Sequence, residues 1–166
     1  MRTDKTQSKA IPKAMPTESG ETDAISLLMA DHENVKDLFE QFEDLTDRAV
    51  VSKKKLADEI CGELTKHTMV EEEIFYPAVR AAGKEFEDVI DEAFVEHGSA
   101  KQLIADIEAM DPGDELYDAK VKVLSEMIEH HVQEEEGELF PKVRQTKLDL
   151  AELGQQMAER KEEISL

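Results

Sequence analysis

Two stretches of the chain share the same order of residue types, and each begins with a histidine that is followed four residues later by a glutamate. They read HTMVEEEIFYP (residues 67–77) and HVQEEEGELFP (residues 131–141), which gives the pairs His67–Glu71 and His131–Glu135. An α-helix turns by about 100° per residue, so this spacing places the imidazole and the carboxylate on one helix face, one turn apart. Side chains placed in this way can bind one metal ion, or one ion and its neighbour.

Two more histidines complete the pattern. His32 precedes the first stretch and His97 precedes the second, at nearly the same distance, and each directly follows an acidic residue. The chain therefore consists of two similar halves, each with one histidine and then one histidine–glutamate pair. All six side chains fall on the apolar stripe of a predicted helix, and these candidate metal ligands are His32, His67, Glu71, His97, His131 and Glu135.

Apolar residues recur at intervals of three and four along most of the chain, which predicts amphipathic helices. The first helix is expected to begin at the Thr22–Asp23 cap and to end near Asp47, and a link around residues 46–52 leads to the second. The inner stripe of the second helix is predicted to be Leu56, Ile60, Leu64, His67, Glu71, Ile74 and Ala78. The third helix ends near Ala109, the fourth carries the second stretch, and a weakly amphipathic helix is predicted over residues 146–163.

Four long helices joined by short links predict an all-α fold, an up-down-up-down four-helix bundle. The expected organisation is a disordered N-terminal arm (residues 1–21), the bundle (residues 22–145) and a C-terminal helical extension (residues 146–166). Pro77 and Pro141 each remove one helical hydrogen bond, so they are expected to bend or end their helices just beyond the two stretches.

The charge balance narrows the range of partners. The chain has 166 residues, of which 40 are acidic and 20 basic, and its formal net charge is −20. Such a surface repels phosphate groups, so neither nucleic acid nor an anionic membrane is expected as a partner.

The chain has one cysteine, no apolar run near the roughly 20 residues that span a bilayer, and no apolar N-terminal stretch of signal-peptide type. We therefore expect a cytoplasmic protein.

Two carboxylates in the core of a bundle are very unfavourable unless something compensates their charge. Few basic residues share the inner stripe, and Lys101, at its edge, is the nearest. Two divalent cations, bridged by the glutamates and flanked by the imidazoles, would compensate both carboxylates, and iron, manganese and zinc all suit this ligand set. We expect His130 to lie outside the site, the aromatic residues, Tyr76 among them, to pack in the core, and four glutamates to form solvated faces: Glu72, Glu73, Glu134 and Glu136.

Taken together, these motifs and the FYP and LFP tails resemble the hemerythrin-like (HHE) cation-binding domain over about residues 24–145. The resemblance implies a non-haem di-iron centre in which His32 and His67 bind one iron, His97 and His131 bind the other, and an oxo or hydroxo group completes the bridge made by Glu71 and Glu135. Oxygen-carrying hemerythrins have a second histidine four residues after the first one on the third helix, where this chain has Lys101.

The resemblance implies a protein that binds dioxygen or a related small molecule, such as nitric oxide, as a carrier, store or sensor. Because Lys101 stands where a third imidazole would bind, one iron would have an open position. An enzyme that decomposes peroxide is therefore the alternative. Iron storage, repair of iron–sulfur centres, and a non-catalytic module stabilised by metal are further alternatives.

Overall fold

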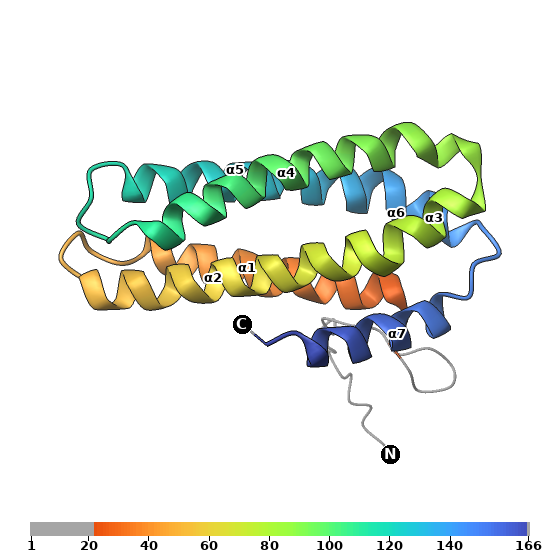
Figure 1. The fold of residues 1–166 in the computed structure, drawn as a ribbon, viewed down its shortest axis with the longest axis horizontal. Helices are drawn as coiled ribbons and strands as arrows, with labels where there is room; N and C mark the ends of the chain where they lie inside the picture. Colours follow the sequence, from red (N-terminus) through yellow and green to blue (C-terminus); the bar gives the residue numbers. More distant parts are fainter. Residues whose placement is uncertain (1–21, 166) are drawn as a thin grey trace, which may run out of the picture.

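The computed structural model describes residues 22–165, so the predicted arm at residues 1–21 lies outside the described part of the chain. Four long helices form the bundle: α1 (Ala24–Glu43), α2 (Val50–Val70), α4 (Glu87–Ala109) and α5 (Tyr117–Glu134). They run alternately up and down, with α1 beside α2 and α4 beside α5 (Figure 1). The all-α up-down-up-down bundle predicted from the sequence is confirmed.

Both long helices that carry a repeated stretch continue beyond it through a short π-helical segment. Helix α2 passes through η1 (Glu71–Phe75) into α3 (Tyr76–Ala82), and α5 passes through η3 (Glu135–Leu139) into α6 (Phe140–Arg144). A single 3₁₀ turn, η2 (Lys84–Phe86), then leads from α3 into α4. Each π segment begins at the glutamate of its histidine–glutamate pair.

The prolines act differently from the prediction. Pro77 and Pro141 lie in the first turns of α3 and α6, and both helices continue past them, so the irregularity precedes each proline instead of following it. A proline has no N–H to donate, and its ring collides with the carbonyl four residues earlier. A π turn moves the helical hydrogen bonds to the fifth residue back, as in the bond from the Tyr76 N–H to the Glu71 carbonyl, which opens the helix at this point.

The π turn also shifts the buried face of the second helix by one residue. The predicted stripe continued from Glu71 to Ile74 and Ala78, but the buried positions are Phe75 and Val79. The extra residue in the wide turn changes the register of every residue that follows it. The predicted stripe is therefore wrong after Glu71, and Tyr76 turns inward as well.

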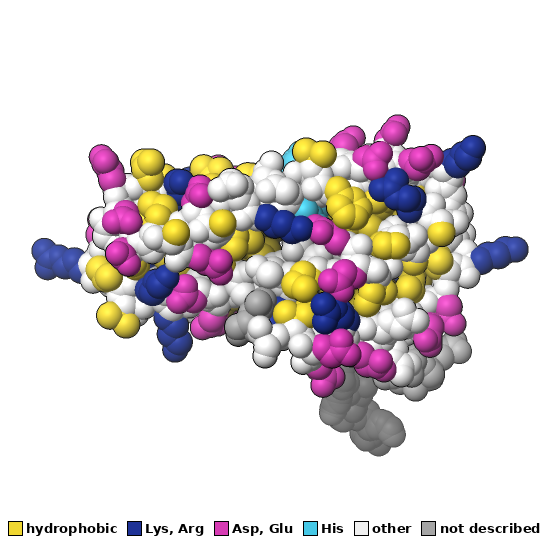
Figure 2. Space-filling model, viewed as in Figure 1, with side chains coloured by type: hydrophobic (Ala, Val, Ile, Leu, Met, Phe, Trp, Pro, Cys, Tyr) yellow, Lys and Arg dark blue, Asp and Glu magenta, His cyan; other side chains and the backbone are white. Residues whose placement is uncertain are grey.

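The core is divided into two hydrophobic clusters by a layer of polar side chains. One cluster includes Leu28, Phe75 and Ile90, and the other includes Leu64, Ile104 and Leu124. Along each long helix the chain passes from one cluster to the other at its buried histidine. In Figure 2 acidic and basic side chains are interspersed over the surface, and little histidine is visible.

A further helix, α7 (Leu150–Glu163), packs across the outside of α1 and α2 (Figure 1). It starts after the Asp149 cap, four residues later than predicted, and buries Met157 and Gly154 against the bundle. Glycine is needed at position 154 because a Cβ there would lie 2.3 Å from the Thr22 backbone oxygen. Among the described helices, none is both long and apolar enough to cross a membrane.

Candidate metal centre

The polar layer contains all six residues that the sequence pattern singled out. Each long helix contributes one histidine, and the two glutamates are the first residues of the π segments. None of the six exposes more than 8% of its surface: His32, His67, Glu71, His97, His131 and Glu135. Buried side chains of these types must be compensated by one another or by a bound cation.

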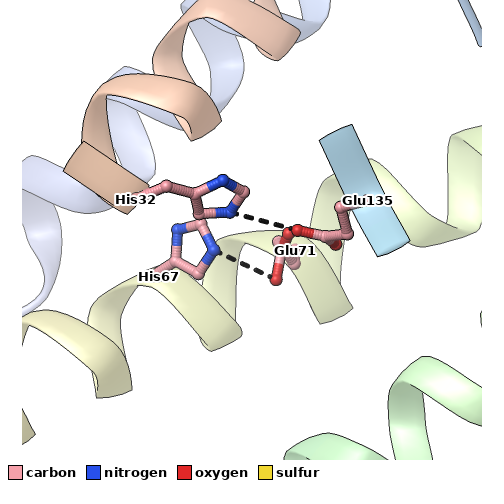
Figure 3. Close-up of side chains that lie close together, drawn as sticks. All are labelled: His32, His67, Glu71 and Glu135. Atoms are coloured by element: carbon pink, nitrogen blue, oxygen red, sulfur yellow. Dashed lines mark ion pairs between the residues drawn. The ribbon is translucent and has the colours of Figure 1, made fainter. Parts of the chain in front are cut away.

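The six side chains form two adjoining groups whose ligand atoms lie within 4.8 Å of one another, with Glu71 in both: His32, His67, Glu71 and Glu135 in the first, and Glu71, His97 and His131 in the second. In the first group, which Figure 3 shows, the His32 Nε2 atom lies 3.1 Å from Glu135 Oε1. The His67 Nε2 atom lies 3.3 Å from Glu71 Oε1.

The second group shares Glu71 with the first, and its His131 also lies close to Glu135. His97 Nε2 lies 3.1 Å from Glu71 Oε1, and His131 Nε2 lies 3.3 Å from Glu135 Oε2. The two imidazole nitrogens are themselves 3.3 Å apart. Each glutamate therefore reaches one histidine of each group, which is the position that a carboxylate bridging two cations must occupy.

A metal ion fits this site because several buried ligand atoms lack hydrogen bonds. Within residues 22–165, no hydrogen bond is made by His32 Nε2, His67 Nε2, either oxygen of Glu71, or Glu135 Oε1. Leaving such groups unsatisfied in a protein core costs about 1–3 kcal/mol each, and more for charged groups. Imidazole nitrogen and carboxylate oxygen are the ligands that iron, manganese and zinc accept.

The outer nitrogen of each of the four buried histidines is held by a second carboxylate, and these four pairs form a closed ring around the bundle. Each carboxylate lies on one long helix or on the π segment that follows it, and it accepts a hydrogen bond from the histidine of the next long helix along the chain. The carboxylate after α5 accepts its hydrogen bond from the histidine of α1, which closes the ring. The bonds join Asp31 to His67 (2.9 Å), Glu72 to His97 (2.7 Å), Glu96 to His131 (2.6 Å) and Glu136 to His32 (2.7 Å). When Nδ1 carries the proton, the lone pair of Nε2 faces inward and is free for a metal.

Comparison with known proteins agrees with this geometry. The family model described as the hemerythrin HHE cation binding domain matches residues 23–143. The chain belongs to the hemerythrin HHE cation-binding family. As a member of this family it is a metal-binding protein, and the resemblance inferred from its motifs is confirmed.

Relatives of this HHE domain include proteins of different length. A Mycobacterium tuberculosis protein named Rv2633c is 31% identical over 112 residues, which are 66% of this chain and 67% of that one. A Nostoc DNA nickase is 29% identical over 118 residues, which are 71% of this chain but only 32% of the nickase. A solved Mycobacterium kansasii HHE domain-containing protein, a homolog of Rv2633c, superimposes with a TM-score of 0.71 at 27% identity and covers 85% of this chain and 86% of that one.

The electrostatics of the HHE site favour alternating positive and negative charges. Burial lowers the pKa of the His131 imidazole, but Glu135, Glu71 and Glu96 outweigh burial and raise it to about 10. Burial by itself would raise the pKa of Glu135, but His131 and His32 hold it well below its usual value. Protons therefore compete with metal ions for the same inward-facing nitrogen atoms.

Two of the four glutamates expected on solvated faces belong to the ring instead. Glu72 and Glu136 lie one residue after the inner glutamates, so they point about 100° away and reach the histidine of a neighbouring helix. Glu73 and Glu134 lie on the surface, as predicted, and His130, whose side chain is 64% exposed, pairs with Glu134 outside the two inner groups.

The lysine that replaces a third imidazole does not join the inner groups. Lys101 has a half-exposed side chain, and its Nζ donates a hydrogen bond to Glu72 at 2.7 Å. Tyr76, which the residue pattern assigned to core packing, lies beside the inner groups. Its buried hydroxyl donates a 2.5 Å hydrogen bond to Glu135 Oε2. The second half of the repeat has Phe140 at the matching position.

Proposed function

We propose that this HHE protein is a non-haem di-iron protein that binds dioxygen or a related small molecule as a carrier, store or sensor. In this proposal one iron is bound by His32 and His67, the other by His97 and His131, and Glu71 and Glu135 bridge them. The observation that carries the proposal is that each glutamate lies 3.1–3.3 Å from one histidine of each group. Ferrous iron, when bound, would supply the electrons that reduce dioxygen as it binds.

The surroundings of the site suit a ligand of very few atoms. A cavity of about 20 Å³ adjoins all four histidines, and its wall includes apolar side chains such as Val35, Leu64 and Ile128. Such a space accommodates roughly one water-sized molecule. The apolar wall limits the entry of water, and the ring of outer carboxylates keeps each imidazole in the orientation that a metal requires.

The metal content and the optical spectrum together test the proposal. The protein should be purified from its native host, analysed for metals, and examined in reduced, aerobic and peroxide-treated forms. We expect two irons per chain and a spectrum that changes reversibly when dioxygen is added and removed. Irreversible oxidation to the ferric form on exposure to air would refute a carrier role, and a single metal ion per chain would refute the dinuclear centre.

Peroxide decomposition at the same pair of metals is the second candidate. It is favoured by Lys101, which occupies the position of the third imidazole but is paired with Glu72 outside the inner groups. A metal with fewer protein ligands leaves room for peroxide. Steady-state release of oxygen from peroxide by the iron-loaded protein, compared with an equal amount of free iron, distinguishes this activity from simple binding.

Nucleic acid remains outside the proposal, although one relative is named a DNA nickase. The formal net charge of −20 opposes contact with a phosphate backbone. The matched segment is also only 32% of that relative, so the remaining two thirds of the nickase have no counterpart in the match.

A further inference from the structure

Helix α7 lies outside the four-helix bundle, yet it contacts the outer ring of carboxylates. It follows the segment that the family model matches, which ends at residue 143, and it packs across α1 and α2 (Figure 1). The Nζ atom of Lys161 donates a 2.5 Å hydrogen bond to Asp31 Oδ1 on α1. The other oxygen of this carboxylate, Oδ2, accepts the 2.9 Å hydrogen bond from His67 Nδ1. One carboxylate therefore joins α7 to a candidate metal ligand.

The contact between Lys161 and Asp31 is partly shielded from water. The side chains of Lys161, Asp31 and His67 are 23%, 14% and 6% exposed. Fully exposed ion pairs contribute little, because solvent screens them and two long side chains lose conformational freedom. A shielded hydrogen bond between two charged groups is stronger, so Lys161 limits the rotation of Asp31 that would release His67.

The position of Lys161 on α7 follows from the packing of that helix. Gly154 and Met157 are the buried residues of α7, and Lys161 follows them at a spacing of three and then four residues. This spacing places all three on one helix face. Met157 packs in the hydrophobic cluster that includes Leu28, and Gly154 lies against the backbone of Thr22. The lysine therefore reaches Asp31 when the apolar face of α7 is docked on the bundle.

The lysine beside the second group has a different origin. Lys101 donates its hydrogen bond to Glu72, but it belongs to α4, which is one of the four bundle helices. Undocking α4 would unfold the bundle. Helix α7 packs on the outside, so it can leave while the bundle remains folded, and Lys161 would leave Asp31 with it.

We infer that Lys161 is a positioning residue for the metal ion bound by His32 and His67, and that it couples this ion to the docking of α7. A metal ion on Nε2 of His67 requires the imidazole proton to be on Nδ1, where it is donated to Asp31. The bound ion therefore fixes Asp31, and the fixed carboxylate holds Lys161 and α7 in place.

Such a coupling is reciprocal. Docking of α7 raises the affinity for the ion by the same factor by which the ion favours docking. The inference rests on the dinuclear centre proposed above, and it provides a sensor with an element at the surface, α7, whose docking follows the state of the site.

The first test compares the iron affinities of three variants of the full chain. Ferrous iron is titrated without oxygen in competition with a coloured chelator. Lys161→Met removes the charge and keeps an apolar stem, and Lys161→Arg keeps the charge and a donor. Arg160→Gln is the matched control, because Arg160 also joins α7 to the bundle, through a 2.7 Å hydrogen bond to Glu73, but Glu73 is not a member of the ring.

We expect Lys161→Met to weaken the binding of one of the two irons by about 5–10-fold, at the lower end of the usual couplings between sites. Lys161→Arg should recover most of the affinity, and Arg160→Gln should bind both irons as the wild type does. A double variant then tests whether Lys161 acts through Asp31. In the background of Asp31→Asn, whose amide offers one oxygen to two donors, Lys161→Met should change the affinity by no more than about twofold.

Hydrogen exchange of the α7 amides, followed by mass spectrometry, measures the reciprocal effect. Iron should slow this exchange by about the same 5–10-fold in the wild type and in Arg160→Gln, but not in Lys161→Met, whereas the bundle helices should be protected by iron in all three. Wild-type affinity in Lys161→Met, an equal loss in Arg160→Gln, or an undiminished effect of Lys161→Met beside Asp31→Asn overturns the inference. Failure of the wild-type protein to bind two irons refutes the dinuclear centre instead.

Discussion

Replacing Glu71 by glutamine should remove a large part of the stability that metal ions give to the fold. Glu71 has no exposed surface, and its Oε1 atom lies 3.1 Å from His97 Nε2 and 3.3 Å from His67 Nε2. It is the residue that belongs to both inner groups. Glutamine keeps the shape but replaces one oxygen by an NH₂ group and removes the negative charge, so the side chain no longer bridges two cations.

The size of the effect follows from linkage between binding and folding. A ligand at about 100 times its dissociation constant stabilises the native state by about 2.7 kcal/mol, so two independent metal ions contribute roughly 5 kcal/mol. For a chain of this length each kcal/mol raises the melting temperature by about 2–4 °C, which gives a rise of about 10–20 °C on loading. Glu71→Gln, which we expect to lose the second ion, should show about half of this rise or less.

Calorimetric melts with metal and with excess chelator measure the rise, and metal analysis after desalting measures the number of bound ions. Glu135→Ala should behave like Glu71→Gln, because Glu135 reaches both histidine groups as well. His130→Ala is the control, since its side chain is 64% exposed and lies outside the inner groups. The reasoning fails if Glu71→Gln keeps two ions and the full rise, or if His130→Ala loses as much as Glu71→Gln.

Three further predictions concern the metal-free protein, α7 and the outer ring. The pKa of His131 is raised from 6.5 to about 10, so without metal its stabilising effect is complete below pH 6.5 and is lost as the pH rises toward about 10. Urea titrations of the metal-free protein should therefore show the free energy of unfolding falling over this range. With metal present the free energy of unfolding should rise over the same range, because the ligands must be deprotonated to bind the metal. Gly154→Ala, whose Cβ would meet a backbone oxygen at 2.3 Å, should lower the free energy of unfolding in urea by about 1–3 kcal/mol. Gly62→Ala, whose Cβ would have no atom within 4 Å, should raise this free energy by up to about 1 kcal/mol by stabilising α2. Asp31→Asn weakens the hydrogen bond from His67 Nδ1 (2.9 Å) and should lower metal affinity by about 10–100-fold in competition with a coloured chelator, and unchanged affinity would contradict the role given to the ring.

The fold and the inner groups were predictable because they depend on repeats of three and four residues. Each of His32 and His97 sits on the apolar stripe of its own helix, and the pairs His67–Glu71 and His131–Glu135 share a face by spacing alone. When four such helices bury their stripes together, the polar residues on those stripes must meet. The structure brings all six together in one layer, and their role as ligands stays a prediction until metal is measured.

The outer ring was not predictable in the same way, because it depends on contacts between helices. The position of Glu72 on its own helix shows that it points away from the inner stripe, but not whether water or another helix lies there. The structure places His97 of α4 there, 2.7 Å away. Only the distances and crossing angles of the packed helices decide such a contact, and the residue pattern of one helix does not contain them.

Tyr76 was missed for a different reason, the change of helical period at the π segment. With about 100° per residue throughout, Tyr76 would point about 140° away from Glu71 and outside the site. In the structure its N–H bonds to the Glu71 carbonyl, five residues back, so one wide turn returns it toward the face of Glu71. The proline at position 77 was the available signal, because a proline in a continuing helix requires a local departure from the α-helical period.

The two halves of the repeat therefore produce unequal sites from nearly equal parts. Both inner groups have two imidazoles and include Glu71. Each also has an outer carboxylate held by a lysine, since Lys161 of α7 contacts Asp31 and Lys101 contacts Glu72. The phenol oxygen of Tyr76, however, enters one group, and the matching Phe140 ring brings only carbon to the other. In the proposed dinuclear centre the two ions would therefore have different neighbours, a phenol oxygen near His97 and His131 and an aromatic ring stacked on His32.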